Sequence, residues 1–193
     1  MALRFSVDTN IFLNVKNKEE PYYRYSKKIL ELIDDGEAEG VVSTMVVAEL
    51  CAGYHEFNEL TEKDEFLTQL RTNPNYKIVH LDLEVAEEAG RVRAMTHLRL
   101  PDAILVASSL IAGAPILVTH DDQLVKAQGL IRVLAAEQAL KEPMADYLRG
   151  AIEEKVKAEK MSRASRVMDE LREKTKAVKF DSVKVIREAR NSR

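Results

Sequence analysis

The chain has 193 residues, of which 46% are hydrophobic and 32% charged, with one cysteine and a formal net charge of −3. This length predicts one domain with its own core and leaves room for an appendage. No apolar run reaches membrane-spanning length, and the first residues enter a strand pattern directly, so we expect neither a membrane segment nor a signal peptide. The lone Cys51 offers no internal disulfide or zinc cluster, which favours a reducing, cytoplasmic compartment.

The charge is unevenly distributed along the chain. Residues 141–193 contain 15 Lys and Arg against 10 Asp and Glu, a net of +5, which leaves residues 1–140 with a net of −8. A basic segment behind an acidic body predicts two parts with different roles. We therefore expect one domain over residues 1–140 and a charged tail over 141–193.

The first predicted element is a short buried strand that ends at a carboxylate. Leu3, Phe5 and Val7 alternate with less apolar residues, and Asp8 follows at once. In an open α/β sheet, ligands bind at the carboxyl ends of the strands. Asp8 is therefore either the N-cap of the next helix or the first member of a functional site, and this stretch alone leaves both open.

Further helices and strands alternate along the chain. Apolar spacing predicts helices after Asp8 and over residues 21–36, a helix from Met45, a helical hairpin over 54–72, and helices over 83–98 and 98–113. Strands are predicted over 40–43, 77–81, 115–119 and 130–134. Because no hairpin signal joins the strands, the pattern indicates an α/β fold with a parallel, doubly wound sheet.

Four further carboxylates follow strands or begin helices. Glu49 lies about one turn into a helix among apolar neighbours, Asp102 lies in the first turn of another, and Asp121 and Asp122 follow the strand over 115–119. Each has a structural alternative: a surface position for Glu49, a capping role for Asp102, and a solvated loop for the adjacent pair.

If Asp8, Glu49, Asp102 and Asp121 converge, they form a negative pocket. Two like charges 4 Å apart repel by about 4 kcal/mol at an effective dielectric of 20. Such a cluster persists only if it is protonated or neutralised by cations, and hard oxygen ligands suit Mg²⁺ or Mn²⁺. One or two such ions activate water for phosphodiester hydrolysis. The chain has no P-loop, dinucleotide-binding, zinc-peptidase or serine-hydrolase motif.

The carboxylates lie in four short motifs, which are VDTN at 7–10, VVAEL at 46–50, LPDAILVAS at 100–108 and LVTHDDQL at 117–124. With these four motifs in this order, the chain resembles PIN-domain ribonucleases of the VapC toxin type over about residues 3–135. The resemblance implies a five-stranded sheet of order 3-2-1-4-5, a homodimer, and a toxin that cleaves RNA, often tRNA or rRNA. It also implies inhibition by a VapB antitoxin.

The same resemblance assigns roles to individual side chains. It implies that the metal ligands are Asp8, Glu49, Asp102 and Asp121. It also implies supporting hydrogen bonds from Thr9 and Thr119, an ordering role for Asn10, and a position near the site for Ser43. Asp122 is expected to face solvent, and His97 and His120 to lie at the periphery. Because the body is acidic, RNA contacts must come from local basic residues such as Arg91, Arg93, Arg99 or Lys126.

The tail has a thin apolar stripe in a charged background, with a second helix predicted from Asp181. Residues 166–193 resemble the toxin-binding half of archaeal VapB antitoxins. That resemblance implies that an arginine, Arg187 or Arg190, pairs with the acidic cluster and inhibits the nuclease in its own or a neighbouring chain. The alternative is a solvated helix that dimerises or contacts the RNA backbone.

Two other functions compete with the nuclease. The first is a non-catalytic PIN-fold module that binds RNA or protein. The second is a phosphatase of the haloacid-dehalogenase type, which also has Asp at the end of its first strand. That type needs a second Asp two residues later, and position 10 is Asn.

Overall fold

A computed structural model describes residues 3–141. The elements in chain order are β1 (Leu3–Val7), α1 (Thr9–Lys16), α2 (Tyr23–Asp34), β2 (Ala38–Ser43), α3 (Thr44–Glu56), α4 (Leu60–Thr72), β3 (Tyr76–Val79), α5 (Leu83–Thr96), α6 (Leu100–Ile111), β4 (Ile116–Val118), the 3₁₀ helix η1 (Asp122–Ala127) and β5 (Arg132–Leu134). A further helical segment covers residues 136–141, where the described part ends. The predicted tail, apart from its first residue, lies outside the described residues.

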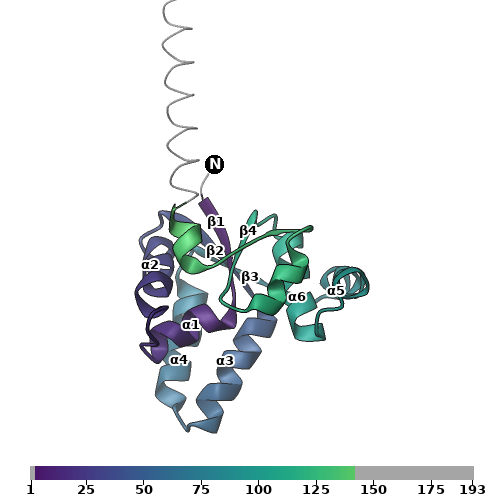
Figure 1. The fold of residues 1–193 in the computed structure, drawn as a ribbon. Helices are drawn as coiled ribbons and strands as arrows, with labels where there is room; N and C mark the ends of the chain where they lie inside the picture. The colour runs from purple at the N-terminus through teal and green to yellow at the C-terminus, as the bar shows by residue number, and fades with distance from the viewer. Residues whose placement is uncertain (1–2, 142–193) are drawn as a thin grey trace, which may run out of the picture. The chain divides into compact units, whose positions relative to one another are not determined.

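The five strands form one sheet of order β3-β2-β1-β4-β5, and all neighbouring strands run parallel. This confirms the predicted α/β class and the strand order 3-2-1-4-5. Helices α1 to α4 lie on one side of the sheet, and α5 and α6 lie on the other (Figure 1). The direction of winding therefore reverses between β1 and β4, which are hydrogen-bonded neighbours paired through Val7 and Val118.

The core lies on both faces of the sheet, because helices cover both. Val7, Val41 and Leu117 are completely buried, as uninterrupted apolar runs in parallel strands predict. Helix α6 packs against β2 and β4 with small polar residues at the contact. Ser109 Oγ on α6 also donates to Ser6 Oγ on β1 at 2.6 Å, so these buried hydroxyls are satisfied.

Gly40 on β2 permits the close approach of α2 to the sheet. A Cβ atom at this position would lie 2.9 Å from Ile33 Cδ1 and 3.0 Å from Tyr76 Cδ1. Only glycine therefore fits here without displacing its neighbours. The contact fixes β2, and with it the start of α3, relative to α2.

Most predicted elements are confirmed, with shifted ends. Helix α2 begins at Tyr23 rather than at Pro21, which lies in the preceding turn. The predicted hairpin is the α3–α4 pair, and α3 runs without a break to Glu56. The 3₁₀ helix η1 was not predicted, because six residues are too few for a helical period to be visible.

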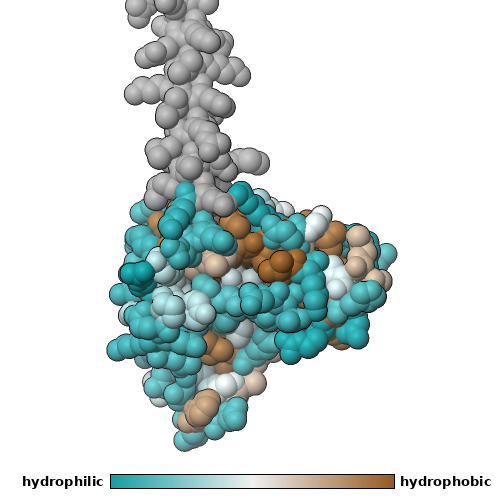
Figure 2. All heavy atoms as spheres, viewed as in Figure 1, coloured by the Kyte–Doolittle hydropathy of each residue, from teal (hydrophilic) through white to brown (hydrophobic). Residues whose placement is uncertain are grey.

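The surface carries no long apolar helix in the described part. None of the helices within residues 3–141 combines the length and apolar character that crossing a bilayer requires. On the face seen in Figure 2, hydrophilic side chains dominate and the apolar ones lie in separate groups. Scattered apolar side chains of this kind are normal on a protein surface.

Candidate active site

Asp8 lies at the point where the winding of the sheet reverses. It directly follows β1, and its backbone N–H donates to Val118 O on β4 at 3.1 Å. In parallel α/β sheets, the crevice at such a point is where ligands bind. Asp8 is also the N-cap of α1, because Oδ1 accepts from the Thr9 N–H at 2.7 Å. The capping interpretation is confirmed, and it leaves Oδ2 for other partners.

Two side chains hold Asp8 Oδ2 from different elements. Thr119 Oγ1 donates to it at 2.6 Å, and Asn10 Nδ2 donates to it at 2.6 Å. The backbone N–H groups of His120 and Asp121 then donate to Asn10 Oδ1 at 3.2 Å and to Thr119 Oγ1 at 2.9 Å. These bonds join the start of α1 to the loop that follows β4, and they fix the Asp8 carboxyl group in one orientation.

The surroundings of Asp8 raise the pKa of its carboxyl group from 3.8 to about 6. The main cause is burial, since the residue is only 8% exposed. The hydrogen bonds from Thr119 and Thr9 lower the pKa, whereas the negative charges of Glu49 and Asp121 raise it. These two carboxylates therefore lie near enough to act on Asp8.

Glu49 and Asp121 reach this neighbourhood from separate elements. Glu49 lies on the exposed side of α3, where Thr9 Oγ1 donates to Oε2 at 2.5 Å. Asp121 is the N-cap of η1, and its Oδ1 accepts from the Gln123 N–H at 2.8 Å. Thr9 thus connects the start of α1 to Glu49, and the cap fixes Asp121.

Asp102 lies in the first turn of α6, after Pro101, as predicted. Its carboxylate accepts a hydrogen bond from Arg99 Nε at 3.1 Å, and this ion pair joins a largely buried acid, 13% exposed, to an arginine that is 77% exposed. The hydrogen bond to Asp102 and its charge raise the pKa of Arg99, and Asp121 and Glu49 add smaller contributions in the same direction. One guanidinium group therefore experiences three of the four predicted carboxylates.

The donor chemistry of this site suits a hard divalent cation. Carboxylate oxygens with neighbouring hydroxyl and amide oxygens are the ligands that Mg²⁺ and Mn²⁺ prefer. Within residues 3–141, however, no three His, Cys, Asp or Glu side chains lie close enough together to hold a metal ion as they stand. Asp8 has no cationic partner among the residues that the structure describes, and Asp102 is paired with Arg99. The residue types therefore fit such an ion, and their present side-chain positions do not form a complete ligand set.

Other residues singled out from the sequence take different places. The Ser43 hydroxyl bonds to the Ser108 hydroxyl at 2.9 Å and caps α3, and neither hydrogen bond involves one of the four carboxylates. Asp122 is exposed, as expected. Arg91 forms an ion pair with Glu88 on α5. Arg187 and Arg190 lie outside the described residues.

The His120 side chain contacts α2 and the residue that precedes it. Its ring lies 4.4 Å from the Tyr22 ring, and its Nε2 lies 3.4 Å from Ser26 Oγ, which in turn accepts from Asn14 at 3.3 Å. Burial lowers the pKa of His120, and the charge of Glu19 raises it. Sequence analysis missed this polar chain, although Ser26 on the apolar face of α2 was a visible signal.

The comparison with protein families decides the classification. A family model described as PIN domain matches residues 6–130. The chain belongs to the PIN domain family. The resemblance that the motifs suggested is thereby confirmed for the domain, and not for the C-terminal segment.

Solved structures with the same fold include toxin–antitoxin complexes. A toxin–antitoxin complex from Klebsiella pneumoniae is 21% identical, with a TM-score of 0.54, and the match covers 68% of this PIN-domain chain and 96% of that chain. VapBC2 from Rickettsia felis, bound to a promoter DNA fragment, is 17% identical, with a TM-score of 0.54 and coverage of 69% and 98%. DNA-bound VapBC from Salmonella typhimurium is 18% identical, with a TM-score of 0.52 and coverage of 69% and 98%. At these identities the likeness shows the fold alone, and no curated protein matches the chain.

Proposed function

We propose that this PIN domain is a metal-dependent endoribonuclease, the toxin of a toxin–antitoxin system, which hydrolyses RNA phosphodiester bonds. The observation that carries the proposal is Asp8, a buried carboxylate at the winding reversal of the sheet whose pKa is raised partly by Glu49 and Asp121. An unneutralised acid in this position indicates a place for cations. The fold shared with VapBC toxin–antitoxin complexes supports the same function.

The proposed metal ligands are Asp8, Glu49, Asp102 and Asp121, with Mg²⁺ or Mn²⁺ as the ion. A bound ion of this kind supplies an activated water and shields the negative phosphate. The chain itself fixes the carboxylates: Thr119 and Asn10 orient Asp8, and Thr9 orients Glu49. Above about pH 6, Asp8 is ionised and available as a ligand.

Restraint of the nuclease is the second part of the proposal. We propose that the inhibitor is a VapB-type antitoxin or the chain's own residues 141–193. In the second case, Arg187 or Arg190 pairs with the carboxylates. The proposed functional form is a cytoplasmic homodimer or higher even oligomer. Complexes of related fold with antitoxins support the partner. Deleting residues 141–193 should increase RNA cleavage, and unchanged or lower cleavage would contradict inhibition by the tail.

A non-catalytic RNA-binding module is the competing function. The observation that favours it is the Arg99–Asp102 ion pair, which occupies one proposed ligand in a site with no preformed ligand set within residues 3–141. Such a module would bind RNA through its basic residues and would not require Mn²⁺.

Asp8→Asn separates these functions. We expect it to abolish Mn²⁺-dependent cleavage of a labelled single-stranded RNA and to leave the circular dichroism spectrum unchanged, because asparagine preserves the cap. Asp64→Asn on the exposed side of α4, purified in the same way, should cleave like the wild type and controls for contaminating nucleases. Retained cleavage in Asp8→Asn would refute the nuclease assignment.

A further inference from the structure

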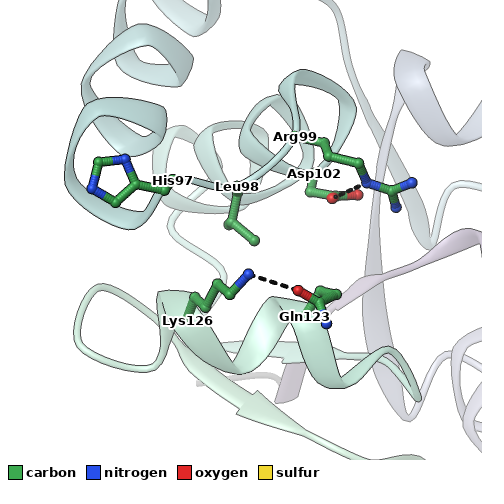
Figure 3. Close-up of a pocket in the computed structure, with 6 residues that line it drawn as sticks. All are labelled: His97, Leu98, Arg99, Asp102, Gln123 and Lys126. Atoms are coloured by element: carbon green, nitrogen blue, oxygen red, sulfur yellow. Dashed lines mark hydrogen bonds and ion pairs between the residues drawn. The ribbon is translucent and has the colours of Figure 1, made fainter.

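A pocket of about 310 Å³ opens beside Asp102, between the start of α6 and η1 (Figure 3). This volume is at the lower end of the range of small-ligand sites, about 300–1,000 Å³. The residues that line it are His97, Leu98, Arg99, Asp102, Gln123 and Lys126. The pocket thus shares Asp102 with the candidate active site and extends from it along the surface.

Two basic residues line this pocket from opposite walls. Arg99 precedes α6, and Lys126 lies on η1 (Figure 3). Arg99 uses only Nε to bind Asp102, and its other two nitrogens make no hydrogen bond to residues 3–141. Lys126 Nζ donates at 2.6 Å to Gln123, whose amide is neutral. In the described part of the chain, the Lys126 ammonium therefore has no acidic partner to offset its charge.

The shape and chemistry of the pocket suit a phosphate joined to a less polar group. A guanidinium edge with two free N–H directions matches phosphate oxygens, and an ammonium adds a second positive charge. Leu98 is buried and points into the space between the two walls, where it forms part of the apolar base of the pocket (Figure 3). A nucleotide combines these features, because its charged phosphate is attached to a sugar and a planar base.

We propose that this pocket binds one backbone phosphate of a single-stranded RNA substrate, with Arg99 and Lys126 as positioning residues. The proposal rests on the proposed function, since it places the strand beside Asp102. It also selects among the basic residues predicted to contact RNA. Arg99 and Lys126 line this cavity, whereas Arg91 and Arg93 are not among its lining residues.

Binding measured without divalent metal tests the pocket independently of cleavage. The full-length chain is titrated, in EDTA, into a fluorescent 12-nucleotide RNA of mixed sequence. The double variant R99Q/K126Q should bind about tenfold more weakly, and its log-affinity should fall less steeply with log salt, by about 0.7, because the pocket no longer neutralises its one phosphate. The K28Q/R71Q variant loses the same charge on exposed residues of α2 and α4, on the other side of the sheet (Figure 1), and should bind within about twofold of wild type.

Cleavage kinetics provide the second measurement. With Mn²⁺, R99Q/K126Q should raise KM about tenfold and change kcat by less than about threefold, because the residues hold substrate and do not touch the reacting atoms. Equal weakening by both double variants would overturn the proposal, since general charge would then explain binding. Unchanged binding in R99Q/K126Q would also overturn it.

These outcomes are separable from the fate of the nuclease assignment. If the wild type cleaves RNA and R99Q/K126Q binds normally, the nuclease stands and the pocket proposal fails. If the wild type binds RNA without cleaving it and R99Q/K126Q alone loses binding, the pocket proposal stands and the nuclease assignment fails.

Discussion

The two acidic ends of the candidate site are held in different ways. Asp8 follows a central strand, and it is fixed by hydrogen bonds from Thr9, Asn10 and Thr119. Asp102 begins a helix, and its ion-pair partner is the exposed side chain of Arg99. The Asp8 end is therefore set by the sheet and its loops, whereas the Asp102 end depends on one long side chain that solvent can reach.

This difference assigns separate tasks to the two ends. A buried carboxylate held in one orientation gives a site its geometry, because little must reorganise when a ligand binds. An ion pair whose arginine is solvent-exposed contributes little stability, and that arginine easily exchanges its partner. We therefore expect substitutions at the Asp8 end to change stability and catalysis, and substitutions at the Asp102 end to change ligand affinity.

The largest expected effect is on the pH dependence of stability. The pKa of Asp8 is about 6 in the folded state, against an ordinary value of 3.8 that applies to the unfolded chain. The folded state therefore binds this proton more tightly than the unfolded state does. The resulting destabilisation is absent below pH 3.8, grows as pH rises, and reaches about 3 kcal/mol above pH 6. Asp8→Asn removes it. Relative to wild type, the variant should gain about 2 kcal/mol between about pH 4.5 and 7.5.

Urea denaturation in EDTA measures this gain, since chelation removes any contribution from bound metal. Asp64→Asn changes an exposed acid on α4 and should follow the wild-type pH profile. If the stability of Asp8→Asn varied with pH in parallel with that of the wild type, the buried carboxyl group would not titrate as described. A gain at neutral pH would also show that Asp8 is retained for function at the expense of stability.

The next expected effect is on cleavage, and it differs between two adjacent acids that follow β4. Asp121 caps η1 and acts on Asp8, whereas Asp122 is exposed. Asparagine caps helices as well as aspartate does, so neither substitution should unfold the chain. Asp121→Asn should lower Mn²⁺-dependent cleavage by about a hundredfold, as removal of a group that stabilises active-site charge does, and Asp122→Asn by less than about twofold. Equal losses would contradict the separation of the two roles.

The sequence predicted the Asp8 end better than the Asp102 end, for a physical reason. Alternating apolar residues and a carboxylate at the strand end are local patterns, and topology brings Asp8 and Thr119 together once the strand order is known. The Arg99–Asp102 ion pair depends on the rotamer of an exposed side chain, which no periodicity encodes. Its only sequence signal was an i, i+3 spacing across the start of α6.

A third effect tests the hydrogen bonds that fix Asp8. The buried Thr119 hydroxyl bonds with Asp8 Oδ2, Asn10 Nδ2 and the Asp121 N–H. Thr119→Val keeps the shape and removes these bonds, so the free energy of unfolding should fall by about 1.5 kcal/mol. The pKa of Asp8 should rise further, because the Thr119 bond lowers it. Urea denaturation against Thr68→Val, whose hydroxyl is exposed on α4, measures the difference.

Thr68→Val should change stability by less than about 0.5 kcal/mol, the usual range for surface substitutions. If Thr119→Val destabilised the protein no more than this control, the Asp8 end would not be fixed by these bonds. The distinction between the two ends of the site would then have to rest on burial alone.

The smallest effect concerns the exchange of partners at Asp102. Arg99→Gln removes a positive charge that pairs with this carboxylate, so Mn²⁺ should bind about threefold more tightly by calorimetry, a modest gain because exposed pairs are weak. Arg91→Gln, which breaks the pair with Glu88 on α5, should leave Mn²⁺ affinity unchanged. Since Arg99 is also proposed to hold RNA, its loss should strengthen metal binding while weakening RNA binding. Damage to the fold would weaken both, so opposite changes in one variant would identify Arg99 as the side chain that passes from Asp102 to the substrate.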